Sequence, residues 1–135
     1  MKKTSDLSIS YSLIVNESHI DELEHVNNVV YVGWIQDAAV MHWREVAGDT
    51  IQKQYVWVIV RHEIDYKASA KLNNELIIKT YVVDAHNVTS RRKVEIRRKS
   101  DNKLLVEGLT TWCLLDAKTF RPTKITEEIR NCFLL

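Results

Sequence analysis

The sequence of 135 residues predicts one α+β domain, in which a long central helix is wrapped by a curved antiparallel sheet of about five strands. Five segments are rich in β-forming residues, and clusters of turn-forming residues separate them, as in consecutive hairpins. A sixth segment, residues 28–47, has only six plainly polar side chains in twenty positions. A helix that is apolar on nearly every side must be covered, and the five strands are the available cover.

The first predicted strand covers residues 7–15, where apolar side chains at odd positions alternate with serines. Such alternation is typical of a strand that is buried on one face. The second strand alternates similarly and is expected to carry Val58 and Val60 on the same face as Ile64. The later strands are expected over residues 56–66, 76–83, 88–98 and 104–115, and a short final helix over residues 126–131.

The apolar segment contains two kinds of local preference. Its β-branched and aromatic run at residues 29–32 favours a strand, whereas residues 36–47 favour a helix that ends at Gly48, a natural C-terminal cap. Asn27 or Asn28 is suited to cap the start of such a helix. We therefore interpret the whole segment as the buried central helix.

Charge and cysteine content exclude several classes of protein. The 19 Lys and Arg residues nearly balance the 18 Asp and Glu residues, which argues against nucleic acid as a partner. Cys113 and Cys132 are too few for a disulfide framework and lack the spacing of a metal site, and Cys113 is expected in the core. The start of the chain lacks the apolar stretch of a secretion signal, and no run could span a membrane, so we expect a cytoplasmic protein with no membrane partner.

The polar residues directly before the central helix carry the candidate chemistry. A helix N-terminus presents unpaired backbone N–H groups and a partial positive charge, so it can polarise an acyl oxygen and stabilise an oxyanion. A carboxylate a few residues upstream can attack the same carbonyl or activate a water that attacks it. Asp21 occupies that position.

The run Asp21-x-x-x-His25-Val26-Asn27-Asn28-x-x-Tyr31 resembles the signature of the hotdog-fold thioesterases. It is similar to the 4-hydroxybenzoyl-CoA thioesterase type. It is more similar to the fatty acyl-ACP thioesterases, whose helix reads HVNN, two residues, Y, one residue, GW. The resemblance implies a single hotdog domain over residues 1–135. It also implies hydrolysis of an acyl-CoA or acyl-ACP thioester to a carboxylic acid and a thiol, with no cofactor.

Carried over by position, the resemblance implies that Asp21 is the catalytic carboxylate and that the backbone N–H of Asn28 holds the thioester oxygen. It also implies that His25 positions water or substrate and that Tyr31 lines the acyl pocket. Whether Asp21 attacks directly or activates water stays open.

The sequence departs from the resembled families at several positions. The benzoyl-CoA type usually has glycine where this chain has Glu24, and plant-type acyl-ACP thioesterases have asparagine where it has Leu23. Their second catalytic carboxylate falls near Ala68 and Ser69, so that part of their machinery is missing here.

A basic segment is the candidate for binding the substrate's carrier. Residues 90–99 contain six Lys and Arg residues against one acid, Glu95. Coenzyme A carries a phosphorylated ADP and acyl carrier protein is acidic, so either would suit a basic strand. We predict Ser90, Arg91 and Arg92 as the substrate-binding residues and the remaining basic residues as a solvated strand face.

One helix and one sheet leave surface uncovered, which predicts a homodimer. In hotdog proteins two sheets join edge to edge and the active site lies between subunits; the choice between dimer and tetramer stays open. Two alternatives to a thioesterase are a non-catalytic acyl-CoA-binding hotdog domain and a dehydratase of 3-hydroxyacyl thioesters. The acyl chain and its carrier are not determined by the sequence.

Overall fold

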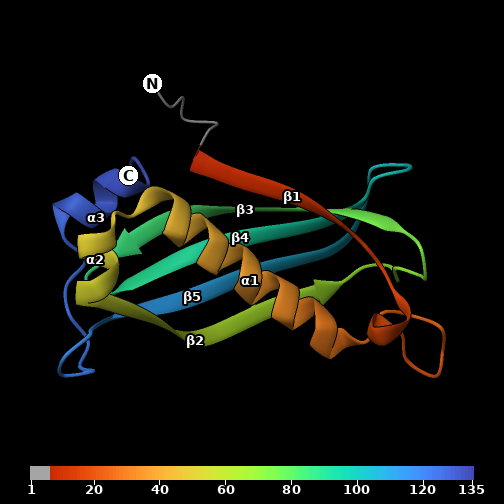
Figure 1. Ribbon diagram of the computed structural model, residues 1–135, viewed down its shortest axis with the longest axis horizontal. Helices are drawn as coiled ribbons and strands as arrows, with labels where there is room; N and C mark the ends of the chain where they lie inside the picture. The colour runs from red at the N-terminus through yellow and green to blue at the C-terminus, as the bar shows by residue number, and fades with distance from the viewer. Residues whose placement is uncertain (1–6) are drawn as a thin grey trace.

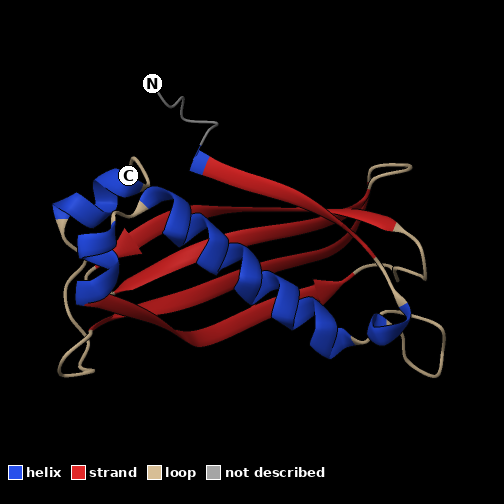
Figure 2. Cartoon of the chain, viewed as in Figure 1, coloured by secondary structure: helices blue, strands red, loops and turns tan. Residues whose placement is uncertain are grey.

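The computed structural model describes residues 7–135, which form one helix-covered antiparallel sheet (Figure 1). The long helix α1 (Asn28–Val46) lies obliquely across one face of the sheet. The short helices α2 (Asp49–Gln54) and α3 (Glu127–Cys132) gather at one end of the sheet, and the short helix η2 (Glu17–His19) lies at the other (Figure 2). The predicted α+β architecture is confirmed. The strands are β1 (Ser8–Ile14), β2 (Tyr55–Tyr66), β3 (Glu75–His86), β4 (Thr89–Arg98) and β5 (Lys103–Asp116); the helices are η2 (Glu17–His19), α1 (Asn28–Val46), α2 (Asp49–Gln54) and α3 (Glu127–Cys132).

The five strands are ordered β1-β3-β4-β5-β2, and every neighbouring pair is antiparallel. β3 and β4 form a hairpin with a two-residue loop whose first residue, Asn87, has φ 57°. Asparagine tolerates this left-handed conformation better than most residues, which suits a tight hairpin. The order places β1 at one edge of the sheet and β2 at the other.

A β-bulge in β2 corrects the predicted alternation of that strand. Ile59 pairs with Trp112 and Arg61 with Thr111, so Val60 is an extra residue in the ladder. The prediction that Val58 and Val60 share a face with Ile64 is therefore wrong. Val58 and Val60 are 40% and 58% exposed, whereas Ile64 packs against the core.

Helix α1 begins as expected and ends differently. The side chain of Asn27 caps it by accepting the N–H of Val29 at 3.0 Å, and the β-branched run that follows is helical. Burial of one side of α1 outweighs the local preference of that run for a strand. The prediction that Gly48 caps the C-terminus of α1 is wrong, because Ala47 occupies that position. Gly48, with φ −71°, instead precedes the short helix α2, which the sequence did not predict.

Two apolar clusters lie between the helices and the sheet. The larger packs Tyr31, Trp34 and Ile35 of α1 against the inward side chains of the sheet, such as Ile78 and Ile96. The smaller lies around α2 and α3, with the side chains of Ala47, Ile51, Ala85, Leu114, Ile125, Ile129 and Phe133. Cys113 is buried, as predicted.

The predicted final helix is present as α3. Thr126 caps it by accepting the N–H of Ile129, and Arg130 donates to the carbonyl of Ala85 at 2.9 Å. These bonds hold α3 over the end of the sheet, next to the end of α1. No helix within residues 7–135 is long and apolar enough to cross a membrane.

Candidate active site

The loop before α1 is closed by the side chain of Asp21. Its Oδ1 accepts the backbone N–H groups of Leu23 at 2.9 Å and His25 at 3.2 Å. The backbone of Asp21 also donates to the carbonyl of His25 and accepts the N–H of Glu24. Oδ2 has no hydrogen-bond partner among residues 7–135. One carboxylate oxygen therefore fixes the loop, and the other is available for chemistry.

Glu24 occupies the position where the resembled benzoyl-CoA type has glycine. Its φ of 63° lies in the left-handed region, which glycine adopts without steric cost. A side chain there costs roughly 1–2 kcal/mol. The loop thus has a backbone that suits glycine, although the residue is glutamate.

The first turn of α1 offers an unpaired donor. Asn28 is the first residue of the helix, and within the described part of the chain its backbone N–H has no acceptor. An N–H at this position points along the helix dipole and is suited to hydrogen-bond an oxygen that becomes negative.

One cavity of about 420 Å³ brings four of the seven predicted site residues together: Asp21, His25, Asn28 and Tyr31 all line it. The side chain of His25 makes no hydrogen bond with any residue from 7 to 135. A substrate in this cavity would meet the carboxylate, the imidazole and the helix N-terminus at once. The other lining residues are Leu23, Val26, Asn27, Tyr66, Lys67, Ala68 and Ser69.

The segment that follows β2 forms the far wall of this cavity. Ala70 anchors it, because its N–H donates to Oη of Tyr31 and its carbonyl accepts the N–H of Val26, both at 3.0 Å. Burial raises the pKa of the Tyr31 hydroxyl. Sequence reasoning missed Tyr66 and Lys67, since only the folded chain brings them beside Asp21. The one available signal was the match of the neighbouring residues 68 and 69 with the second carboxylate of the plant-type enzymes.

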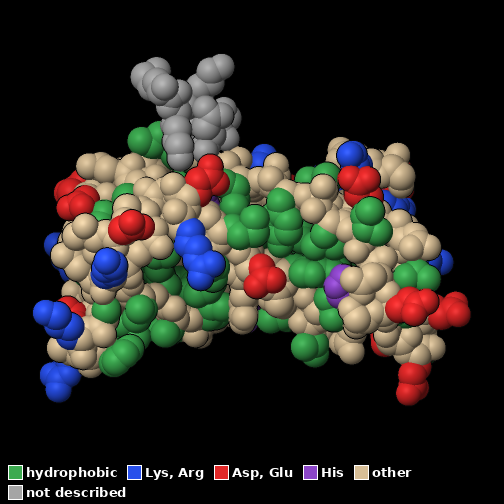
Figure 3. Space-filling model, viewed as in Figure 1, with side chains coloured by type: hydrophobic (Ala, Val, Ile, Leu, Met, Phe, Trp, Pro, Cys, Tyr) green, Lys and Arg blue, Asp and Glu red, His purple; other side chains and the backbone are tan. Residues whose placement is uncertain are grey.

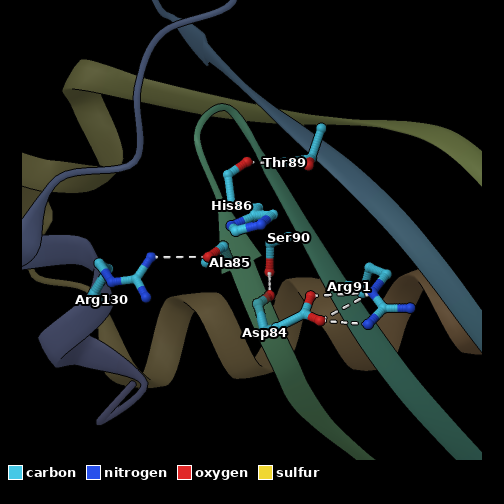
Figure 4. A network of polar contacts seen from close by, with 7 residues as sticks. All are labelled: Asp84, Ala85, His86, Thr89, Ser90, Arg91 and Arg130. Carbon is cyan, nitrogen blue, oxygen red and sulfur yellow. Dashed lines mark hydrogen bonds and ion pairs between the residues drawn. The ribbon is translucent and has the colours of Figure 1, made fainter.

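The three residues predicted to bind the substrate's carrier lie elsewhere, and Figure 4 shows two of them, Ser90 and Arg91. Ser90 donates through Oγ to the carbonyl of Asp84 at 3.1 Å. Arg91 is exposed and paired with the carboxylate of Asp84, whose pKa this contact lowers. Successive strand residues face opposite sides, so Arg92 points inward under α1. The two arginines therefore do not form one phosphate clamp within this chain.

Ser90 and Arg92 line a second cavity, together with Ala39 and Arg44 of α1. Ala39 follows Asn28 by eleven residues, which is about 16 Å along a helix. The predicted site residues thus separate into the four that line the cavity at the start of α1, the buried pair Ser90 and Arg92 near its end, and Arg91 at the surface.

Comparison with known proteins identifies the family of this chain. The model of the acyl-ACP thioesterase N-terminal domain matches residues 6–133. The long-chain acyl-CoA thioesterase FadM of Escherichia coli is 23% identical over 118 residues, which are 84% of this chain and 87% of that protein.

Solved structures share the fold. A 1,4-dihydroxy-2-naphthoyl-CoA thioesterase from Synechocystis superposes with a TM-score of 0.81 at 14% identity, covering 94% of this chain and 96% of that chain. An acyl-ACP thioesterase from Bacteroides thetaiotaomicron gives a TM-score of 0.82 at 16% identity, covering 92% of this chain and 52% of that chain. The predicted hotdog fold is confirmed. Since the family model spans nearly the whole sequence, this chain belongs to the acyl-ACP thioesterase family of thioester hydrolases.

Proposed function

We propose that this thioesterase hydrolyses an acyl-CoA or acyl-ACP thioester to a free carboxylic acid and a thiol in the cavity lined by Asp21. The observation that carries the proposal is the meeting of three groups on that cavity: the carboxylate of Asp21, the imidazole of His25 and the start of α1 at Asn28. The family and the acyl-CoA relative support both carriers.

The reaction assigns one role to each group. Oδ2 of Asp21 either removes a proton from a water that attacks the thioester carbonyl or attacks that carbonyl itself. The N–H of Asn28 donates to the carbonyl oxygen as it becomes an oxyanion. His25 orients the water or the substrate. In the first route the C–S bond then breaks to give the acid, and the thiolate leaves and takes up the proton that Asp21 removed from water. In the second route the departing thiolate leaves an acyl anhydride on Asp21, and a water hydrolyses it, which releases the acid, restores the carboxylate and supplies the proton of the thiol.

Replacing Asp21 by asparagine tests the proposal with little risk to the fold. The asparagine Oδ1 can still accept the N–H groups of Leu23 and His25, which keeps the loop closed, whereas Oδ2 becomes an amide nitrogen. We expect kcat/KM for acyl-CoA hydrolysis to fall at least about a hundredfold. Glu22→Gln, one residue along and exposed, is the matched control and should keep the wild-type rate.

Thiol release from a panel of acyl-CoA chain lengths is the appropriate measurement. A wild-type rate in Asp21→Asn would remove this residue from the mechanism. Tight acyl-CoA binding without thiol release would indicate the non-catalytic alternative, and hydration of crotonyl-CoA without thiol release would indicate the dehydratase. The same panel, repeated with acyl-ACP, identifies the carrier.

The active form proposed is a homodimer joined through β2. This strand has one unpaired edge, and Val58 and Val60 are exposed on it. Hydrophobic side chains also reach the surface on the face that carries α1 (Figure 3), where Val40 and Met41 are exposed. An exposed twelve-residue edge strand with apolar side chains favours pairing with a second sheet. No disulfide joins Cys113 and Cys132, and we place the enzyme in the reducing cytoplasm.

A further inference from the structure

The second cavity is a mostly apolar, partly open pocket lined by two arginines, of which Arg44 is exposed and Arg92 is buried. It encloses about 260 Å³ between the later half of α1 and the inner face of the sheet. Its walls include the indoles of Trp43, Trp57 and Trp112, with Phe133 and the guanidinium of Arg92. The proposed hydrolysis uses none of these residues.

Arg92 is buried without an acid. Its side chain belongs to a residue that is only 5% exposed, and no carboxylate within residues 7–135 forms an ion pair with it. Nη1 donates to Oγ1 of Thr80 at 3.2 Å and lies 2.9 Å from Nδ1 of His42, and the ring of Phe133 lies 5.8 Å away. Burial lowers the pKa of this guanidinium to about 10, which leaves it charged at neutral pH. A lone buried charge is costly unless a counter-ion meets it.

Several hydrogen-bond donors at this cavity have no acceptor. The Nε and Nη2 groups of Arg92 make no hydrogen bond with the described residues, so one side of its planar fork is unused. The indole Nε1 of Trp112 is buried and also has no acceptor within residues 7–135. A buried donor without an acceptor, such as the indole of Trp112, is rare in folded proteins, and together with the unused side of the Arg92 fork on the same cavity it indicates a missing acceptor.

We propose that this cavity binds the carboxylate group of a small apolar acid, with the carboxylate on Arg92 and the hydrocarbon among the tryptophans. A carboxylate offers two oxygens that match the arginine fork, and its single negative charge balances that of Arg92, the buried one of the two arginines that line the cavity. The volume lies just below the roughly 300 Å³ of the smallest typical ligand pockets, which suits a medium-chain or one-ring acid.

Two sources present this chemistry. One is a free acid, which is also the product class of the proposed hydrolysis. The other is the distal carboxylate of an acyl group that is itself a dicarboxylic acid. Only the second source rests on the proposed function.

Tryptophan fluorescence of the full chain reports binding directly, because three of the four tryptophans line the cavity. We expect sodium octanoate to give a saturable change, and 1-octanol of equal length to bind at least tenfold more weakly. Arg92→Met should weaken octanoate at least tenfold and leave octanol unchanged. Arg98→Met removes an arginine of the same strand that pairs with Asp101 at the surface, and should bind as the wild type does.

The wild-type comparison keeps the proposal falsifiable even if Arg92→Met fails to fold. Equal affinity for octanoate and octanol, or no saturable change with octanoate, would overturn it, and so would undiminished octanoate binding by a folded Arg92→Met protein. None of these readings requires turnover. They therefore fail or succeed independently of the proposed hydrolysis, and Asp21→Asn should bind octanoate as the wild type does.

Steady-state kinetics separates the two sources. If the cavity receives the distal end of the acyl group, Arg92→Met raises KM for the CoA monothioester of hexadecanedioic acid, whose extended chain can span the roughly 16 Å between the two cavities, and leaves KM for hexadecanoyl-CoA unchanged. If it receives a free acid, the variant leaves the KM values of both substrates unchanged and loses only the octanoate binding.

Discussion

Among single residues, Tyr31 is the one whose hydroxyl joins the start of α1 to the far wall of the cavity that Asp21 lines. Its ring is fully packed, and Oη accepts the N–H of Ala70. Its predicted place beside the acyl pocket therefore coincides with a structural role. The sequence pattern could suggest that Tyr31 lines a pocket. It could not suggest the hydrogen bond to Ala70, because Ala70 is 39 residues away in the chain.

Tyr31→Phe should lower the free energy of unfolding by about 1–3 kcal/mol, because the N–H of Ala70 loses its buried acceptor. Urea unfolding followed by circular dichroism measures this. Tyr11→Phe is the matched control: its hydroxyl donates to the carbonyl of Trp34 at 3.3 Å from a half-buried site, so a smaller loss is expected. A Tyr31→Phe protein as stable as the wild type would contradict the linking role of Oη.

Glu24→Gly should stabilise the protein by about 0.5–1 kcal/mol. It removes the cost of a side chain in the left-handed conformation, and this gain exceeds the opposing loss that arises because glycine raises the entropy of the unfolded chain. Thermal unfolding of the two proteins measures the difference. Asn102→Gly is a useful comparison, because Asn102 has φ 58° and asparagine already tolerates this conformation. Destabilisation by Glu24→Gly would show that the glutamate side chain has a role that its backbone does not explain.

At the scale of elements, periodicity was a reliable guide and element ends were not. All five strands and α3 were expected within a few residues of their observed bounds, because each buries one face. The bulge at Val60 could not be predicted, since it depends on pairing with β5. The sequence does not predict α2, because a glycine at position 48 is typical of the end of a helix and here precedes one. The start of α1 is predicted better, since Asn27 is one of the two expected caps.

Asn27→Ala should cost about 1 kcal/mol of unfolding free energy, because the N–H of Val29 loses its cap. Asn27→Asp keeps an acceptor at that position and adds a charge that suits the helix N-terminus, so it should remain close to wild-type stability. Chemical denaturation of the three proteins gives the comparison. Equal losses in both variants would mean that the amide group, rather than the cap, stabilises this turn.

At the scale of the whole molecule, the sequence predicted that Asp21, His25 and Asn28 lie together because they are neighbours in the chain, and all three line one cavity at the start of α1. Their catalytic roles stay a prediction. The sequence predicted one binding role for Arg91 and Arg92, because two adjacent arginines are equivalent in the sequence. In the strand their side chains face opposite sides of the sheet. The side of a strand that faces α1 is decided by the register of the sheet, and a run of basic residues carries no such information.

The proposed dimer gives a prediction for the assembled protein. At micromolar concentration, light scattering of the wild type should give twice the chain mass of 15.8 kDa. Val60→Lys places a charge on the free edge of β2 and should shift the protein toward monomer. Val83→Lys, an equally modest change at an exposed valine of the interior strand β3, should leave the dimer intact. A fully active monomeric wild type would exclude the dimer as the working form.

The placement of two cavities at the two ends of one rigid helix has an evolutionary consequence. Substitutions more than about 10 Å apart generally combine additively in free energy. The residues around Asp21 and those around Arg92 can then change independently. A lineage with this fold can acquire a new ligand preference in the cavity around Arg92 while the residues proposed for hydrolysis around Asp21 stay the same.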